Sequence, residues 1–257
     1  MKRISVIFAA MVVMSCETAF GWGKMGHDAI AYIAECNLKP KALKRITEIL
    51  DGKSIVYYSS WMDEVRATPP YKHTTYWHTG PVNERLEYDD NLLTSKGNVI
   101  YALELVLDKL ADWKTLDDST LTVSVRQVVH MVGDMHCPVH AKLPDVNGKY
   151  NIVFSGQDVS YHTVWDSQII EHRHKWFYTE WQHQLDRCSK KEKKAIGEGS
   201  VRDWFHDTAL VTRQVYDAVP RNSKQDKDFL NAMSPVAERQ ILKAGYRLAR
   251  ILNEIFG

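Results

Sequence analysis

Apolar residues recur at intervals of three and four along most of the chain, which is the pattern of helices that bury one face. Strand-like alternation is nearly absent, apart from one short expected strand at residues 150–154. The clearest helical segments are HDAIAYIAECNL (27–38), KALKRITEIL (41–50), NVIYALELVLDKLADW (98–113), STLTVSVRQVVHMVGDMH (119–136), DSQIIEHRHKWFYTEWQHQL (166–185) and SPVAERQILKAGYRLARILNEIF (234–256). The pattern predicts an all-α fold in a single compact domain.

Two polar stretches that contain glycine and proline interrupt this pattern, at residues 66–96 and 141–161. Both are longer than the connections usual between packed helices. Long ordered loops in a compact domain commonly carry function. We therefore expect these two loops to contribute to a site.

The N-terminal residues differ from the rest of the chain, which at 257 residues and 44% hydrophobic content suits one globular domain. Lys2 and Arg3 precede an apolar run at 4–14, and Ala19 and Gly21 occupy the positions that a signal peptidase reads. We expect residues 1–21 to be a cleaved signal peptide and residues 22–257 to be the functional domain, exported to the periplasm or the medium. No later segment approaches the roughly 20 apolar residues of a membrane span.

A second interpretation of the leader is lipidation of Cys16 within VMSC, although Met14 fits such a motif poorly. Cleavage before Trp22 leaves equal numbers of basic and acidic residues. Bulk electrostatics therefore cannot hold the chain to nucleic acid, and any contact with phosphate must be local. Cys36, Cys137 and Cys188 remain without a C-x-x-C spacing, so at most one disulfide can form.

Histidine and aspartate recur at helical spacing in two places. His130 and Asp134 are four residues apart in HMVGDMHCPVH, and His162 and Asp166 are four apart in YHTVWD. On a helix this spacing brings both side chains to one face. The ordinary explanation of each pair is a solvated pair on the protein surface. The first pair, however, has apolar neighbours in the sequence. Burying its charges costs free energy unless a partner such as a metal ion offsets that cost.

Further candidate ligands surround these pairs in the sequence. SSWMDEVR contributes Asp63, with Arg66 one turn later, and YKHTTYWHTG contributes His73 and His78. Including His27 and His140, the set holds six histidines and three aspartates, too many for one ion and suitable for two or three. Nitrogen and oxygen ligands without thiolate favour zinc in a hydrolytic site.

The order of these residues resembles the trinuclear-zinc, single-strand-specific nucleases of fungi, plants and bacteria. The shared features are Trp22 followed five residues later by His27, then W-M-D-x-x-R, W-H, H-x-x-G-D-x-H-x-P-x-H and H-x-V-W-D. The likeness extends through GNVIYALELVLDKL to the closing AGYRLARILN. In that family the leader is removed so that the new terminal tryptophan binds zinc through its free amine and its carbonyl.

The resemblance implies three zinc ions with defined ligands. One would be held by Asp63, His78, His130 and Asp134, a second by Trp22, His27 and Asp134, and the third by His140, His162 and Asp166. His78 is preferred to His73 because the W-H pair and its distance from Asp63 match the family pattern, and His136 is expected to be structural.

The reaction that the resemblance implies is in-line displacement at a phosphodiester, giving 5'-phosphate nucleotides, with 3'-nucleotidase activity in many members. The paired zincs would share a hydroxide and the third would neutralise the leaving 3' oxygen. Asp63 and Arg66 are the predicted catalytic residues, with Arg66 clamping the phosphate. The ordinary explanation for an arginine at position 66 is a surface ion pair with Glu64 or another neighbour. Single-stranded nucleic acid is the expected partner, no stable protein partner is implied, and we expect a monomer.

Several positions depart from the family pattern. Thr79 follows His78 where the family commonly has an aromatic that stacks a base, so Tyr76, Trp77, Tyr57 or Tyr58 would have to replace it, unless these aromatics belong to the core. Ser167 stands where asparagine is frequent. Arg66, Tyr76, Thr79 and Ser167 are the candidate substrate-binding residues. Cys137 occupies a position that is commonly polar.

Two other functions remain open at this point. Zinc-dependent phospholipases C belong to the same superfamily, but their ligand series ends in glutamate and their first histidine lies farther from the tryptophan. A non-catalytic zinc protein is the third alternative. Such a protein would have no reason to keep Arg66. The Arg66→Ala variant therefore distinguishes a catalyst, which should lose turnover with its metals intact, from a non-catalytic protein, which should not change.

Overall fold

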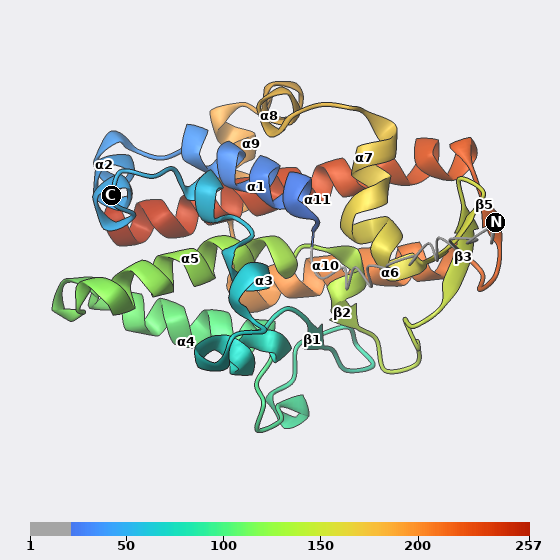
Figure 1. Ribbon diagram of the computed structural model, residues 1–257, viewed down its shortest axis with the longest axis horizontal. Helices are drawn as coiled ribbons and strands as arrows, with labels where there is room; N and C mark the ends of the chain where they lie inside the picture. Colours follow the sequence, from blue (N-terminus) through green and yellow to red (C-terminus); the bar gives the residue numbers. More distant parts are fainter. Residues whose placement is uncertain (1–21) are drawn as a thin grey trace, which may run out of the picture.

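The computed structural model describes residues 22–257, and the predicted signal peptide and Cys16 lie outside these residues. Helices dominate the described chain (Figure 1), as the apolar periodicity predicts. The α-helices are α1 Lys24–Cys36, α2 Pro40–Ile49, α3 Trp61–Val65, α4 Val99–Ala111, α5 Asp118–Asp134, α6 Tyr161–Thr163, α7 Ile169–Arg173, α8 Tyr178–Leu185, α9 Lys190–Gly197, α10 Val201–Asp217 and α11 Lys227–Phe256.

Short 3-10 turns and strands fill the connections. The turns are η1 Ile55–Tyr58, η2 Pro69–Tyr76, η3 Asp90–Leu92, η4 Trp113–Thr115 and η5 Pro138–His140, and η6 Val164–Gln168 is a π-helical turn. The strands are β1 Gly80–Pro81, β2 Ala141–Lys142, β3 Asn151–Phe154, β4 Gln157–Ser160 and β5 Lys224–Gln225. The strand expected at 150–154 is therefore confirmed as β3.

Helix α11 is the backbone of the packing. Its 30 residues extend about 45 Å, and in Figure 1 it runs behind α1 and α7. Helix α1 packs closely along it, and a side chain at Gly245 of α11 would collide with Ile33 of α1. Helix α5 lies against α11, α4 and α1, and its last two turns are buried on every side. The C-terminal end of α5 is therefore a rigid place for functional groups.

The two long loops meet through a strand pair. Gly80 of β1 pairs in parallel with Ala141 of β2. This pairing sets His78, two residues before β1, near His140, the residue before β2. Neighbouring strands β3 and β4 form a hairpin whose turn residues, Ser155 and Gly156, both have positive φ, as a tight two-residue turn requires.

The helix predicted over 166–185 is wrong as one element. It is divided into η6, α7 and α8, because His174 adopts an extended backbone and its ring stacks on Trp176 at 3.8 Å. A new helix then begins at Tyr178, where the Glu180 carboxylate accepts a hydrogen bond from the Phe177 N–H at 2.8 Å.

The C-terminal helix begins seven residues before the predicted start at 234. Proline at 235 suggests a first helical turn, but α11 continues through it from Lys227. The earlier turn is stabilised by the Asp226 side chain, which accepts from the Asp228 N–H at 3.1 Å, and by burial of Phe229 against Phe154. Tertiary packing here outweighs the local signal.

Candidate metal centre and active site

Helix α5 supplies the centre of the site. His130 Nε2 lies 3.0 Å from Asp134 Oδ2, as their four-residue spacing predicts, and both residues are fully buried. The other ring nitrogen of His130 donates to the Ser59 carbonyl at 2.8 Å, which fixes the orientation of the imidazole. The pair is therefore a rigid buried group and not a surface ion pair.

Helix α1 brings His27 to the same carboxylate. His27 Nε2 lies 3.4 Å from Asp134 Oδ1, and its ring stacks on His130 with 4.1 Å between centroids. A Cβ at Gly133 would meet His27 Nδ1 at 2.7 Å, so glycine is needed where α1 crosses α5. Trp22 is fully buried beside this helix, and the N–H of Gly23 donates to the Asp166 carbonyl.

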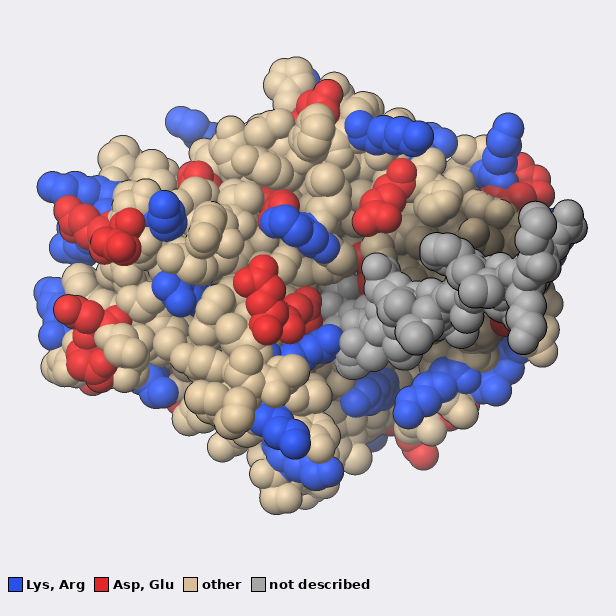
Figure 2. Space-filling view, in the orientation of Figure 1, with Lys and Arg blue, Asp and Glu red and all other residues tan. Residues whose placement is uncertain are grey.

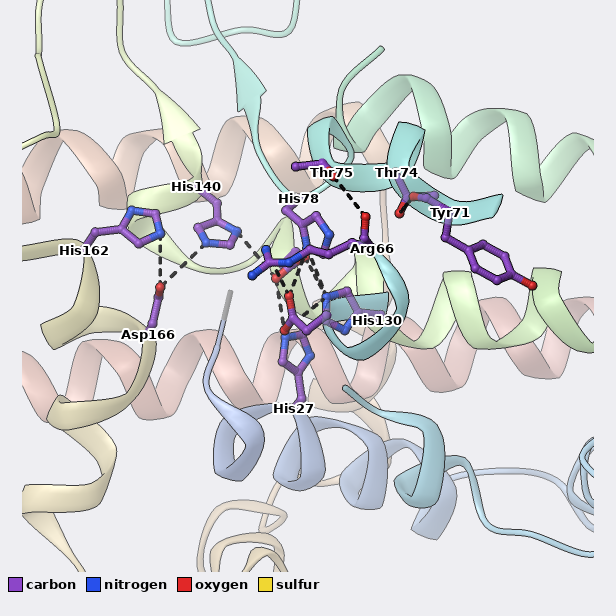
Figure 3. Close-up of polar contacts among 12 residues, drawn as sticks. His27, Arg66, Tyr71, Thr74, Thr75, His78, His130, His140, His162 and Asp166 are labelled. Atoms are coloured by element: carbon purple, nitrogen blue, oxygen red, sulfur yellow. Dashed lines mark hydrogen bonds and ion pairs between the residues drawn. The ribbon is translucent and has the colours of Figure 1, made fainter. Parts of the chain in front are cut away.

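Asp63 and His78 complete this first cluster from the first long loop and the short helix before it. His78 Nδ1 lies 2.8 Å from Asp134 Oδ2 and 3.7 Å from Asp63 Oδ1. Asp63 Oδ2 lies 3.8 Å from His130 Nε2. His27, His78 and His130, from three segments that are distant in sequence, thus point toward one another (Figure 3). Each lies within 3.4 Å of the Asp134 carboxylate.

A second cluster forms around Asp166. His162 Nε2 lies 3.1 Å from Asp166 Oδ2, and His140 Nε2 lies 3.6 Å from Asp166 Oδ1. The π-helical turn η6 sets the backbone between His162 and Asp166, and turns of this kind are frequent at functional sites. His140 also connects the two clusters, since its Nδ1 lies 3.6 Å from Asp134 Oδ1. Figure 3 shows His140 between His162 and His78.

The chemistry of these groups fits metal ions. Ligand atoms about 2.0–2.2 Å from one zinc are separated from each other by about 3–3.5 Å, close to the spacings found here. Groups of mutually adjacent ligand atoms are His27–Asp63–His130, His78–His130–Asp134 and Cys137–His140–Asp166. In addition, His27 Nε2, Asp134 Oδ1 and Asp166 Oδ2 make no hydrogen bond of normal geometry within residues 22–257. Buried polar atoms left in this way are the expected feature of a site completed by cations.

The electrostatics agree with this interpretation. Burial alone would raise the pKa of Asp134, but His130 and His78 hold it well below its ordinary value. Burial would lower the pKa of His130, yet Asp134 and Asp63 raise it to about 9. Burial dominates at His27 and His78, whose pKa values are lowered. Burial also raises the pKa of Asp63. At His140 burial would lower the pKa, but Asp166 and Asp134 raise it. The imidazoles of His27 and His78 are therefore ready to act as neutral ligands, whereas those of His130 and His140 must give up a proton to bind a metal ion.

Arg66 lies beside the clusters and not on the outer surface. Its Nη1 is 3.4 Å from Asp63 Oδ1, and only 12% of its side chain is exposed. Burial lowers the pKa of Arg66, while Asp63, Asp134 and Asp166 all act to raise it. The guanidinium therefore lies in the combined field of three carboxylates, next to His78 in Figure 3.

A pocket of about 740 Å³ opens from the clusters, lined in part by His78 and His162. Tyr76 and Thr79, two candidate substrate-binding residues, also line it. Ser167 does not, since its hydroxyl hydrogen-bonds to the Thr163 carbonyl at 3.5 Å and its Cβ lies where a side chain at Gly23 would collide.

Other aromatics that were candidates for base stacking lie elsewhere. Trp77 lines a smaller pocket against α4 and α5, with His73 packed edge-on to its ring at 4.9 Å. Tyr57 and Tyr58 line a third pocket beside α1. Of these aromatics, Tyr76 alone reaches the pocket at the metal centre, and this residue is 46% exposed.

The sequence marks Cys137 only as a departure from the family pattern and does not predict its contact with the second cluster. Its buried thiol donates to Asp166 Oδ1 at 3.6 Å, and burial raises the pKa of this thiol well above its ordinary value. Its position between His136 and Pro138, inside the H-x-x-G-D-x-H-x-P-x-H pattern, was the available signal. His136, in contrast, faces away, and its ring bonds to the Val132 carbonyl at 2.7 Å and to Arg247 Nη1 at 3.0 Å.

Comparisons with known proteins agree with this geometry. The S1/P1 nuclease family model matches residues 22–257. Endonuclease 2 of Arabidopsis thaliana is 24% identical over 291 residues, covering 99% of this chain and 97% of the plant protein. Nuclease P1 of Penicillium citrinum is 27% identical over 269 residues, covering 92% of this chain and 98% of its own. Nuclease S1 of Aspergillus oryzae is 25% identical over 287 residues, covering 99% and 98%.

These matches favour a nuclease over the phospholipase C and the non-catalytic protein that the sequence left open, and they extend over the clusters and the pocket alike. The chain therefore belongs to the S1/P1 nuclease family and is a single-strand-specific nuclease, a hydrolase of nucleic acids.

Proposed function

We propose that residues 22–257 form an exported three-zinc nuclease that cleaves single-stranded DNA and RNA to 5'-phosphate nucleotides and also removes 3'-phosphates. The observation that carries the proposal is the pair of buried clusters joined through Asp134 and His140, next to a pocket that is open to solvent. None of the helices in residues 22–257 is long and apolar enough to cross a membrane. We further propose that the chain acts as a monomer.

The ligand assignment is supported by the convergence of the side chains. Asp63, His78, His130 and Asp134 would hold one zinc, and His140, His162 and Asp166 another. Trp22 and His27 would hold the third with Asp134, once removal of residues 1–21 frees the amine of Trp22. Zinc in such a site makes hydroxide available at neutral pH and offsets negative charge on phosphoryl oxygens.

The chain's own residues would orient and stabilise the substrate. Arg66 can donate two parallel hydrogen bonds to nonbridging phosphate oxygens, and this contact strengthens as negative charge develops in displacement. Asp63 holds the guanidinium in place at 3.4 Å. Tyr76 and Thr79 at the pocket wall would contact the base or sugar, with the exposed Tyr76 ring available for stacking.

The first experiment is release of acid-soluble nucleotides from single-stranded DNA and RNA by the chain that begins at Trp22. Chelator should abolish release and zinc should restore it, while duplex DNA of the same sequence should be cleaved slowly. A form extended by a few residues before Trp22 is the matched control for the terminal amine. Absence of release from protein that carries three zincs would refute the proposal, and a phosphocholine lipid tested in parallel would report the phospholipase alternative.

A further inference from the structure

The pocket beside the metal centre has an uneven distribution of charge. Among residues 22–257, Lys142 and Lys149 line it, together with His78 and His162, and no aspartate or glutamate does. The equally large pocket beside α1 differs, since its cations Lys24 and Arg126 share it with the carboxylates of Asp28 and Glu64. Figure 2 shows Lys and Arg side chains gathered over β2 and the loop after it.

Neither ammonium group in the first pocket has an acidic partner. Within residues 22–257, Lys142 and Lys149 form no ion pair and donate no side-chain hydrogen bond. Some lysines elsewhere are paired, as Lys24 is with Asp28 at 2.9 Å and Lys193 with Asp186 at 2.6 Å. The two pocket lysines therefore keep their full capacity to bind an anion.

Both lysines are exposed residues on the wall of the same pocket. Among residues 22–257, a polyanion that enters this pocket therefore meets two positive charges and no carboxylate on its wall. This arrangement suits a negatively charged ligand.

Both lysines are carried by anchored backbone. Lys142 lies in β2, paired with Pro81 of β1 and two residues after His140. The turn before Lys149 is fixed because Asn147 Oδ1 accepts from the Lys149 N–H at 3.0 Å and Arg221 donates to the Asn147 carbonyl at 2.9 Å. The cations therefore follow the metal centre along one wall, in a fixed order.

We propose that Lys142 and Lys149 bind non-scissile phosphates of the nucleic acid strand, next to the phosphate that is cleaved. The inference rests on the proposed function and refines its substrate class, because a site for flanking phosphates makes the enzyme prefer strands of several nucleotides to a dinucleoside monophosphate. A phosphate contact of this kind recognises the backbone and not the base, so the preference is for length and not for sequence.

The test compares Lys142→Ala/Lys149→Ala with Lys142→Arg/Lys149→Arg, which keeps the charge, and with Lys44→Ala on the exposed face of α2 as the control. The kcat/KM of each zinc-loaded protein is measured over a range of salt concentrations, on a dinucleoside monophosphate and on a single strand of about ten nucleotides. Binding of a phosphorothioate strand that resists cleavage is measured in parallel.

The alanine double variant should lose about tenfold in kcat/KM on the longer strand at low salt and keep its rate on the dinucleoside monophosphate. Its salt dependence on the strand should become shallower by about 0.7 in logarithmic slope for each lysine removed. The arginine variant and the Lys44→Ala control should keep both the parental rate and the parental slope.

An unchanged slope and rate in the alanine variant would overturn the proposal, as would an equal loss on both substrates, which would assign the lysines to the scissile phosphate or to folding. Failure of the parental protein to cleave any strand would instead refute the proposed function. In that case, the salt dependence of phosphorothioate-strand binding would still show whether Lys142 and Lys149 contact phosphate.

Discussion

The floor and the wall of the same cleft carry opposite charge. The floor is made of three carboxylates, on Asp63, Asp134 and Asp166, surrounded by imidazoles and almost wholly buried. The wall, made by β2 and the loop after it, presents two lysines and, within the described part of the chain, no carboxylate. Each region is incomplete alone, since the floor requires cations and the wall requires anions.

The comparison teaches how this fold can cleave a polyanion without a basic surface. The chain has a formal net charge of only +1, so long-range attraction to nucleic acid is weak. Positive charge is instead concentrated where phosphate must bind, on Arg66, on two lysines and on the metal ions that the floor would hold. The predictions below alter one region while leaving the other intact.

The largest effect is expected for Asp134→Asn, which removes charge from the carboxylate that three histidines of the first cluster and His140 approach. Activity should fall at least about 10³-fold, because metal ligation contributes several kcal/mol to catalysis. Zinc content, measured by elemental analysis, should fall with it. A variant with parental zinc and parental turnover would contradict the assignment of the floor.

Arg66→Ala should separate phosphate binding from metal binding. Loss of a donor to the developing charge is expected to lower kcat by about 10²–10³-fold while zinc content stays at the parental value. Arg66→Lys should recover part of the rate, and Arg187→Ala, at an exposed position, is the control. Parental turnover in Arg66→Ala would remove the proposed mechanism, and loss of zinc would show that Arg66 stabilises the floor instead.

Removal of metal should destabilise the fold. A ligand present at about 100 times its Kd stabilises the folded state by about 2.7 kcal/mol, and chelation would then lower Tm by roughly 5–10 °C for a chain of this length. Scanning calorimetry with and without chelator measures the shift. Chelation should lower the Tm of Asp134→Asn much less than that of the parental protein. An equal shift in both proteins would mean that metal bound at the clusters is not the source of the stabilisation.

The smallest expected effect is the release of a proton from His130 when zinc binds at the floor. Without metal the pKa of His130 is about 9, raised from 6.5, so the imidazole is charged at neutral pH. Zinc binds the neutral ring, hence uptake should release a proton at pH 7 and affinity should rise with pH up to about 9. The stability that this charged pair gives the metal-free protein is present below pH about 6.5 and lost as pH rises through about 9.

Titration calorimetry of zinc binding in two buffers with different ionisation enthalpies measures that release. The observed heat should depend on the buffer at pH 7, and this dependence should shrink above pH 9. A heat that is identical in both buffers at pH 7 would show that His130 is neutral before zinc binds.

Much of the secondary structure could be predicted because the helical pattern is local. The periodicity of 119–136 predicts α5, and the spacing of His130 and Asp134 predicts their contact. The failures have local causes as well. Helices α9 and α10 do not stand out by periodicity, yet Ser189 with Glu192 and Ser200 with Asp203 form capping boxes that mark their starts.

The pocket could not be predicted in the same way. Whether Tyr76, Trp77, Tyr57 or Tyr58 replaces the missing aromatic depends on which side of each turn faces the clusters, and composition says nothing of that. The contact of Cys137 with Asp166 could not be predicted either, because it joins residues 29 positions apart on two different elements.

The sequence by itself determined that this chain is a mostly helical member of a nuclease family, because helical periodicity and the family motifs are written in neighbouring residues. It also named candidate ligands, through the resemblance to that family. Only the tertiary structure decided that Asp134 is shared by two clusters, that Tyr76 reaches the pocket, and that Lys142 and Lys149 line its wall unpaired. These are matters of which distant segments meet, and that is set by packing against α1, α5 and α11 and by the pairing of β1 with β2.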